Sequence, residues 1–287
     1  MSLFRLCGIV GFLIGSWSAI AIAQESPVED TTALKSSLYF HAPFDGGTDA
    51  KMARHDRALY TAPNLQRETA EVGQHRADVE IVAGDGRHGD ALRFRGKDKQ
   101  VLFYRGANMN FRSTDWQGTV SLWLRLTPDE DLKDGYSDPL QITDKAWNDG
   151  SFFIDFDIDS PRTFRLGVFS EYRYWNPKDV KWEDWPVADR PMIHVPRPPL
   201  QRDRWTHVAW TFQGINSVDE KPATCKFFVD GKLQGTMERP LKFAWDLERT
   251  AIMLGLDYVG DLDELMIFDR ALTEAEIRQL QTFFNED

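Results

Sequence analysis

The chain has 287 residues, of which 42% are hydrophobic, and a formal net charge of −11 at pH 7. This composition supports a buried core. The acidic balance repels phosphate backbones and anionic membranes, so we expect no nucleic-acid partner.

The N-terminal segment has the pattern of a secretory signal. Residues 1–23 combine one positive charge at Arg5, an apolar stretch and the small-x-small ending Ala21-Ile22-Ala23. Signal peptidase accepts that ending, which predicts cleavage between Ala23 and Gln24. We therefore expect a secreted or periplasmic protein with no membrane insertion after cleavage, followed by a polar linker over residues 24–37.

From residue 38 to residue 287 the chain is a series of short strand patterns separated by turns. Most alternate apolar and polar residues or end in Gly, Asp or Pro, as half-buried antiparallel strands do. The patterns are LYFHAPFDGG, ALRFRG, QVLFYRG, GTVSLWLRLT, SFFIDFDID, TFRLGVFS, WTHVAWTFQG, TCKFFVDGKLQG, AIMLGLDYVG and DELMIFD. They predict an all-β domain built as a two-sheet antiparallel β-sandwich, or jelly roll.

Two local signals are sharper than the rest. Asp230-Gly231 suits a tight hairpin turn that needs positive φ. Thr273 with Glu276 three residues later forms a capping box and predicts one short C-terminal helix.

Several segments together resemble one family. HGDALRFRG, GTVSLWLRL, DRWTHVAWTF, CKFFVDGKLQG, IMLGL and GDLDELMIFDRALTEAEIRQL are similar, in order and spacing, to the laminin-G-like jelly-roll domains of the concanavalin A-like lectin/glucanase superfamily. The resemblance covers residues 38–287. It implies the fold, but the fold hosts lectins, glycosidases and adhesion modules, so it does not imply one function.

The resemblance also implies a structural Ca²⁺ ion. Family members often hold calcium between an N-terminal loop and the last strand, which makes Asp45 in FDGGTD and Asp263 in GDLDE the expected ligands. The alternative is that Asp263 accepts backbone hydrogen bonds at a strand start and Asp45 caps a turn. Strict alternation would place Asp263 and its neighbour Glu264 on opposite faces of that strand.

A second candidate is a ladder of carboxylates. FIDFDIDSP places Asp155, Asp157 and Asp159 on one face of a predicted strand. The pattern looks like the Glu-x-Asp-x-Glu strand of laminarinase-type glycosidases, with Asp in place of Glu at both ends. A retaining hydrolase needs carboxyls about 5–5.5 Å apart, whereas the ends of this ladder are roughly 13 Å apart on a regular strand. A solvated acidic face is the favoured interpretation.

The third candidate is the loop over residues 170–200. Six prolines there exclude a regular helix or a central strand, and a long loop of this kind often carries function. Aromatic rings stack on sugars, so the loop predicts a binding surface. The alternative is that these rings pack down as a small core over a sheet. The candidate ligand-binding residues are Tyr174, Trp175, Trp182 and Trp185.

These signals favour an exported, non-catalytic binding module. A glycan is the leading ligand class and an extracellular protein the next. One alternative is a polysaccharide-active glycoside hydrolase that uses Asp155, Asp157 and Asp159. Another is a structural element of the cell envelope that binds no sugar.

Overall fold

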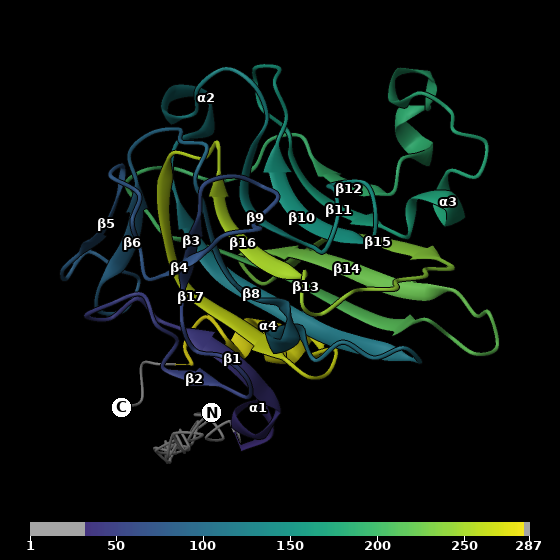
Figure 1. The fold of residues 1–287 in the computed structure, drawn as a ribbon, viewed down its shortest axis with the longest axis horizontal. Coiled ribbons are helices and arrows are strands. Elements are labelled where there is room, and N and C mark those ends of the chain that lie inside the picture. The colour runs from purple at the N-terminus through teal and green to yellow at the C-terminus, as the bar shows by residue number, and fades with distance from the viewer. Residues whose placement is uncertain (1–31, 284–287) are drawn as a thin grey trace, which may run out of the picture. The chain divides into compact units, whose positions relative to one another are not determined.

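The computed structural model describes residues 32–283 (Figure 1). The predicted signal peptide at residues 1–23 and the start of the expected linker lie outside the described residues. The regular secondary structure of the described chain is mostly β-strand, arranged in two antiparallel sheets, which confirms the all-β sandwich.

The first sheet has nine strands, of which seven follow the order β15-β14-β13-β8-β17-β1-β2, while β6 pairs with β17 and β5 with β6. Its strands are β1 (Leu38–Ala42), β2 (Met52–Ala53), β5 (Val79–Val82), β6 (Ala91–Phe94), β8 (Trp116–Arg125), β13 (Thr206–Ile215), β14 (Ala223–Val229), β15 (Lys232–Arg239) and β17 (Gly260–Phe268).

The second sheet has eight strands in the order β12-β11-β10-β9-β16-β7-β3-β4. Its strands are β3 (Tyr60–Ala62), β4 (Glu71–Val72), β7 (Val101–Arg105), β9 (Ser137–Thr143), β10 (Ser151–Phe156), β11 (Phe164–Phe169), β12 (Met192–Val195) and β16 (Ala251–Leu256).

The described helical segments are short. They are α1 (Thr32–Ser37), α2 (Pro128–Asp131), α3 (Tyr172–Trp175) and α4 (Glu274–Gln279), with 3₁₀ turns η1 (Gly106–Met109), η2 (Trp182–Asp184) and η3 (Val187–Asp189). Within residues 32–283 no helix is long and apolar enough to cross a membrane.

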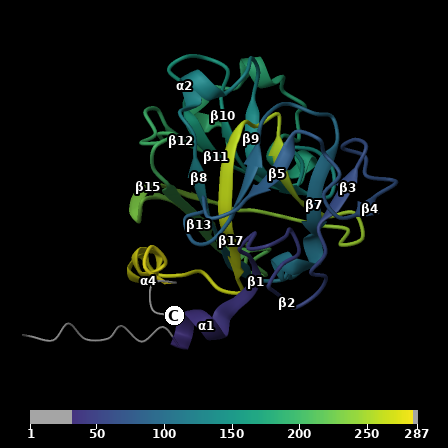
Figure 2. The same ribbon diagram turned by 90° about the vertical axis from the view of Figure 1, so that its left-hand side faces the viewer.

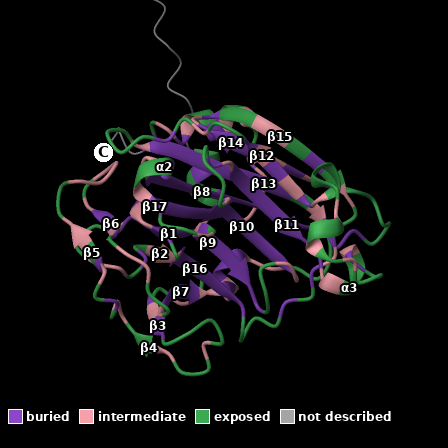
Figure 3. Ribbon diagram, turned by 90° about the horizontal axis from the view of Figure 1, so that it is seen from above, coloured by how far each residue is buried: buried purple, intermediate pink, exposed green. Residues whose placement is uncertain are grey.

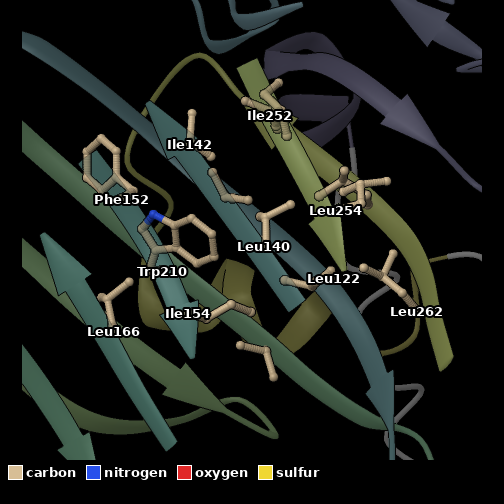
Figure 4. Packing of buried hydrophobic residues seen from close by; sticks show 14 of the residues in the cluster. Leu122, Leu140, Ile142, Phe152, Ile154, Leu166, Trp210, Ile252, Leu254 and Leu262 are labelled. Atoms are coloured by element: carbon tan, nitrogen blue, oxygen red, sulfur yellow. The ribbon is translucent and has the colours of Figure 1, made fainter. Parts of the chain in front are cut away.

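The main core lies between the two sheets. Inward positions of both sheets are apolar at every second residue, so each sheet buries one face against the other. Figure 4 shows Leu122 and Trp210 of the first sheet among Leu140 and Ile154 of the second, and all four side chains are fully buried.

The outer face of the first sheet is covered by helices α1 and α4 (Figure 2). Leu34 of α1 and Ile277 of α4 belong to one buried cluster with Phe228 and Met266 of the sheet. Residues 32–37 of the expected linker thus form a helix that packs on the domain. The predicted capping box of α4 is confirmed, since the Thr273 side chain accepts the Glu276 N–H and Glu276 accepts the Thr273 N–H.

The hairpin prediction is also confirmed. Asp230 and Gly231 join β14 to β15 with φ of 47° and 67°, the left-handed conformation that a tight hairpin turn requires.

Strict alternation in β17 is wrong at Glu264. This residue has φ of 51°, and the register of β17 against β8 shifts between Asp263 and Met266. The bulge brings Leu262 and Leu265, three residues apart, into the same core. Alternation along the sequence therefore cannot assign the two acids to faces.

Candidate functional site: a groove on the outer face of the second sheet

Register places side chains from five strands in rows across the outer face of the second sheet. Because paired residues of neighbouring strands point to the same side, one row can be read from β16 to β12. It consists of Met253, Gln141, Phe153, Gly167 and Met192.

The adjacent row carries the charges. Leu256 of β16 pairs with Asp138 of β9, and Asp155 of β10 pairs with Arg165 of β11. The register of β9 against β10 shifts beside Asp155, between Ile154↔Leu140 and Phe156↔Ser137, so Asp155 lies next to Asp138. Two acids far apart in the sequence therefore meet on one face.

Gly167 gives the floor its shape. A Cβ at this position would lie 2.2 Å from Cζ of Phe153, so the absence of a side chain lets that ring lie across β11. The Phe153 ring also stacks on Phe169 at a centroid distance of 5.6 Å. The result is a flat, partly aromatic floor.

These rows form the floor of a groove of about 390 Å³. Its rim carries exposed apolar side chains, with Leu65 51%, Tyr136 49% and Trp147 40% exposed. Trp182 completes the wall, edge-on to Trp147 at a centroid distance of 5.2 Å. Under these loop side chains the strands β10 and β11 are buried at every position (Figure 3).

Electrostatics differ between the two central carboxylates. Arg165 donates from Nε to Oδ1 of Asp155 at 2.8 Å and from Nη2 to Oδ2, and its guanidinium lies 5.2 Å from the ring centre of Tyr136. Burial raises the pKa of Asp155, and the bonded guanidinium opposes that shift. Burial, followed by the charge of Asp155, raises the pKa of Asp138 well above its usual range.

The structure separates the four predicted aromatic residues. Only Trp182 lines the groove. Tyr174 and Trp175 border a different hollow of about 430 Å³ beside β15. Trp185 packs on Trp175 at a centroid distance of 5.4 Å.

The small-core interpretation fits Trp175. Its ring lies 5.1 Å from that of Phe169, and its Nε1 donates to the carbonyl of Asn148 at 2.8 Å. The loop therefore uses part of its aromatic surface to hold itself on the sheet, at the ends of β11 and β12 (Figure 1).

The predicted ladder of three aspartates does not exist. Strand β10 ends at Phe156, so only Asp155 lies on the strand. Oδ1 of Asp157 accepts the backbone N–H of Thr163 at 2.8 Å, and Asp159 is exposed in the turn that follows. The prediction was wrong because the apolar–polar alternation of the sequence continues past the end of the strand.

The predicted calcium ligands both anchor one loop. Asp263 is fully buried and accepts backbone N–H groups of Arg87 at 2.6 Å, His88 at 3.2 Å and Glu264 at 2.8 Å. Asp45 accepts the N–H of Asp90 at 2.9 Å. Among residues 32–283 no group of three or more His, Cys, Asp or Glu side chains is arranged to hold a metal. The hydrogen bonds match the strand-start alternative, and calcium binding stays a prediction.

Sequence reasoning missed most of the groove. Tyr136, Asp138, Gln141, Trp147 and Arg165 line it but come from two strands and two connections. The strand pairing that unites them is not visible in any local pattern. One signal was available, because Trp147 lies in DKAWNDG, a polar turn where a tryptophan has no local reason to occur.

A second hollow, of about 440 Å³, lies over β6, β8 and β17. Its central guanidiniums are already paired: Arg93 and Arg125 both bond to Asp85 and Asp261. Because these charged groups already pair with one another, a ligand would find fewer unpaired groups to bond in this hollow than in the groove.

The family model of the Concanavalin A-like lectin/glucanases superfamily matches residues 95–278. The chain belongs to this superfamily. The match spans all of the groove-lining strands and extends to α4.

Solved structures share the fold at low identity. Domain 4 of AbnA, an extracellular GH43 arabinanase from Geobacillus stearothermophilus in complex with arabinotriose, has a TM-score of 0.51 and 17% identity, covering 85% of this chain and 98% of that chain. The binding domain of Paraclostridial Mosquitocidal Protein 1 has a TM-score of 0.56 and 16% identity, covering 88% of this chain and 53% of that chain. A botulinum neurotoxin type C structure has a TM-score of 0.56 and 11% identity, covering 88% and 53%. The chain thus spans about half of each toxin chain, and no curated protein matches it.

Proposed function

We propose that this protein is a non-catalytic glycan-binding module and that the groove on the outer face of the second sheet is its binding surface. One observation carries the proposal: exposed Tyr136 and Trp147, together with Trp182, flank hydrogen-bonding groups of Asp138 and Arg165 in a single groove.

The chemistry of these groups suits a sugar. Aromatic faces bury the C–H faces of a pyranose or furanose ring, and nearby carboxylate, amide and guanidinium groups bond its hydroxyls. Gln141 on the floor adds an amide that offers both a donor and an acceptor. Exposed aromatic side chains gathered at one concave site are unusual on a protein surface without a binding role.

Proteins of this fold give further support. The arabinanase domain is in complex with arabinotriose, and cell entry of botulinum neurotoxin type C is dependent upon interaction with two ganglioside molecules. Those ligands belong to those proteins. For this chain they support a glycan as the partner class ahead of an extracellular protein.

A hydrolase is the less favoured alternative. Two of the three aspartates proposed for it, Asp157 and Asp159, do not line the groove, and Asp155 is held in a bidentate ion pair. A carboxylate bonded in this way is poorly placed to act as a nucleophile or to exchange a proton.

We further propose that the protein is exported, secreted or periplasmic, after cleavage at Ala23/Gln24. Its described residues include one cysteine, Cys225, which is buried and free, so the fold needs no disulfide after export. N-terminal sequencing of the protein recovered from the periplasm or medium tests the site, and a mature chain that begins at Met1 contradicts it.

Binding to a glycan array tests the main proposal. We expect Trp182→Ala and Trp147→Ala to weaken binding of any bound glycan about tenfold or more, since buried aromatic anchors dominate such interfaces. Tyr174→Ala is the matched control, because Tyr174 is 44% exposed and lies outside the groove. Binding that survives both tryptophan changes refutes the site, and the absence of any glycan ligand favours the structural envelope role.

A further inference from the structure

The groove is strongly biased toward negative charge. One positively charged side chain, Arg165, lines it together with four carboxylates. The guanidinium of Arg190 lies over the ring of Trp182, 4.2 Å from its centre, and does not line the groove. The carboxylates are those of Asp138, Asp155, Glu183 and Asp257.

Arg165 is committed to one of these acids. Its Nε and Nη2 both bond to Asp155, so the central pair is close to neutral. Glu183 and Asp257 are exposed at the rim, where water solvates them. Asp138 is therefore the carboxyl group at the floor that has no bonded cation.

Asp138 is bonded to no cation within residues 32–283, since the Arg165 guanidinium, whose charge opposes the rise in its pKa, bonds to Asp155 instead. Its side chain accepts no hydrogen bond and forms no ion pair there, although it lies on the floor of the groove between Leu256 and Asp155. Burial and the charge of Asp155 both disfavour its ionised form, which raises its pKa. A ligand that brings a positive charge to this carboxylate would remove both penalties, whereas an anionic ligand would increase them.

We propose that the groove selects a glycan that carries a free amino group, with the ligand's ammonium as the counter-ion of Asp138 and its ring faces against Trp147 and Trp182. This inference rests on the proposed function, because it names the ligand class of the same site. It also predicts rejection of glycans rich in carboxylates, such as uronic acid polymers.

The geometry suits such a ligand. Tyr136 lies two residues before Asp138, and both line the groove together with Trp147 and Trp182. One face of the Tyr136 ring lies toward the Arg165 guanidinium, 5.2 Å from the ring centre. The pair formed by Trp147 and Trp182 is therefore the main stacking surface.

Calorimetric titration of the protein with four oligosaccharides of equal length tests the inference. The probes are a glucosamine tetramer, its fully N-acetylated form, a neutral glucose tetramer with the same β-1,4 linkage and a galacturonic acid tetramer. We expect the free amine to bind at least tenfold more tightly than the N-acetylated and neutral tetramers, and the galacturonate to bind least. The comparison needs no variant, so it does not depend on the folding of one.

Two substitutions assign the effect to Asp138. We expect Asp138→Asn to remove the preference for the amine over the neutral tetramer, because the variant side chain carries no charge. Asp159→Asn, which removes the same charge from an exposed turn outside the groove, controls for general attraction between a cationic sugar and an acidic protein. A loss of amine binding in Asp159→Asn as large as in Asp138→Asn overturns the inference.

The two proposals fail differently. Equal binding of the amine and neutral tetramers, weakened in both cases by Trp182→Ala, refutes amine selection but leaves the glycan site intact. Binding that Trp182→Ala and Trp147→Ala do not change refutes the site itself, and the amine inference with it. The same holds if none of the four tetramers binds and an array finds no other glycan.

Discussion

Asp155 and Arg165 form a buried ion pair at the floor of the groove, so removal of one partner should cost more stability than removal of both. The exposed fractions are 4% for Asp155 and 7% for Arg165. Asp155→Asn keeps the size of the side chain but leaves the guanidinium without its bonded carboxylate. Breaking a buried pair in this way costs about 3–5 kcal/mol.

Two features of the groove point to the lower end of that range. Arg165 lines an open groove that water reaches, and the carboxylate of Asp138 is close enough to compensate part of its charge. We therefore expect a loss of about 3 kcal/mol in the free energy of unfolding. For a domain of this size that corresponds to a fall of roughly 6–12 °C in melting temperature.

Urea unfolding followed by tryptophan fluorescence measures this loss. The double variant Asp155→Leu with Arg165→Met should lie within about 1 kcal/mol of the native protein, because apolar residues replace the whole pair. Asp159→Asn is the exposed control and should change stability by less than about 0.5 kcal/mol. If Asp155→Asn is as stable as this control, the buried pair is not what holds the floor together.

Three further predictions follow from particular residues. Gly167→Ala should push the Phe153 ring toward the groove, which should lower the free energy of unfolding by about 1–3 kcal/mol and weaken glycan binding. Unchanged glycan affinity contradicts the described floor. Burial lowers the pKa of His207 from 6.5 to about 3, so the unfolded chain takes up its proton first as the pH falls below 6.5. The contribution of His207 to stability should therefore be about 2 kcal/mol smaller at pH 5 than at pH 7.5, so the difference in unfolding free energy between the native protein and His207→Gln should change by about that amount over this range; a difference that does not change with pH contradicts it. The calcium hypothesis predicts that EDTA lowers the melting temperature of the native protein but not that of Asp263→Asn, and no change on adding EDTA to the native protein refutes it.

Local features of the fold could be predicted because their physics is local. The turn at Asp230-Gly231 depends on which residues tolerate positive φ, and the start of α4 depends on Thr273 and Glu276 in one helical turn. The core faces of the long strands could be predicted for the same reason, since alternation along one strand decides them.

Predictions failed where the apolar–polar alternation of the sequence continued but the regular strand ended or bulged. The alternation through Asp157 and Asp159 persists after β10 has ended. The bulge at Glu264 interrupts a strand whose sequence alternates regularly. In each case the end or bulge depends on pairing with other strands. That information is absent from a short window of sequence.

The class of fold, the core-facing sides of the strands, the hairpin turn and the capped C-terminal helix could all be predicted from sequence alone. The sequence also identified Trp182 as a candidate within an aromatic loop. The three-dimensional structure was needed to show that Trp182 contacts Trp147 while Trp175 packs on Phe169, and that Asp138 lies beside Asp155. The reason is that a binding groove is a property of register between strands distant in the chain, whereas turns, caps and alternation are properties of neighbours along it.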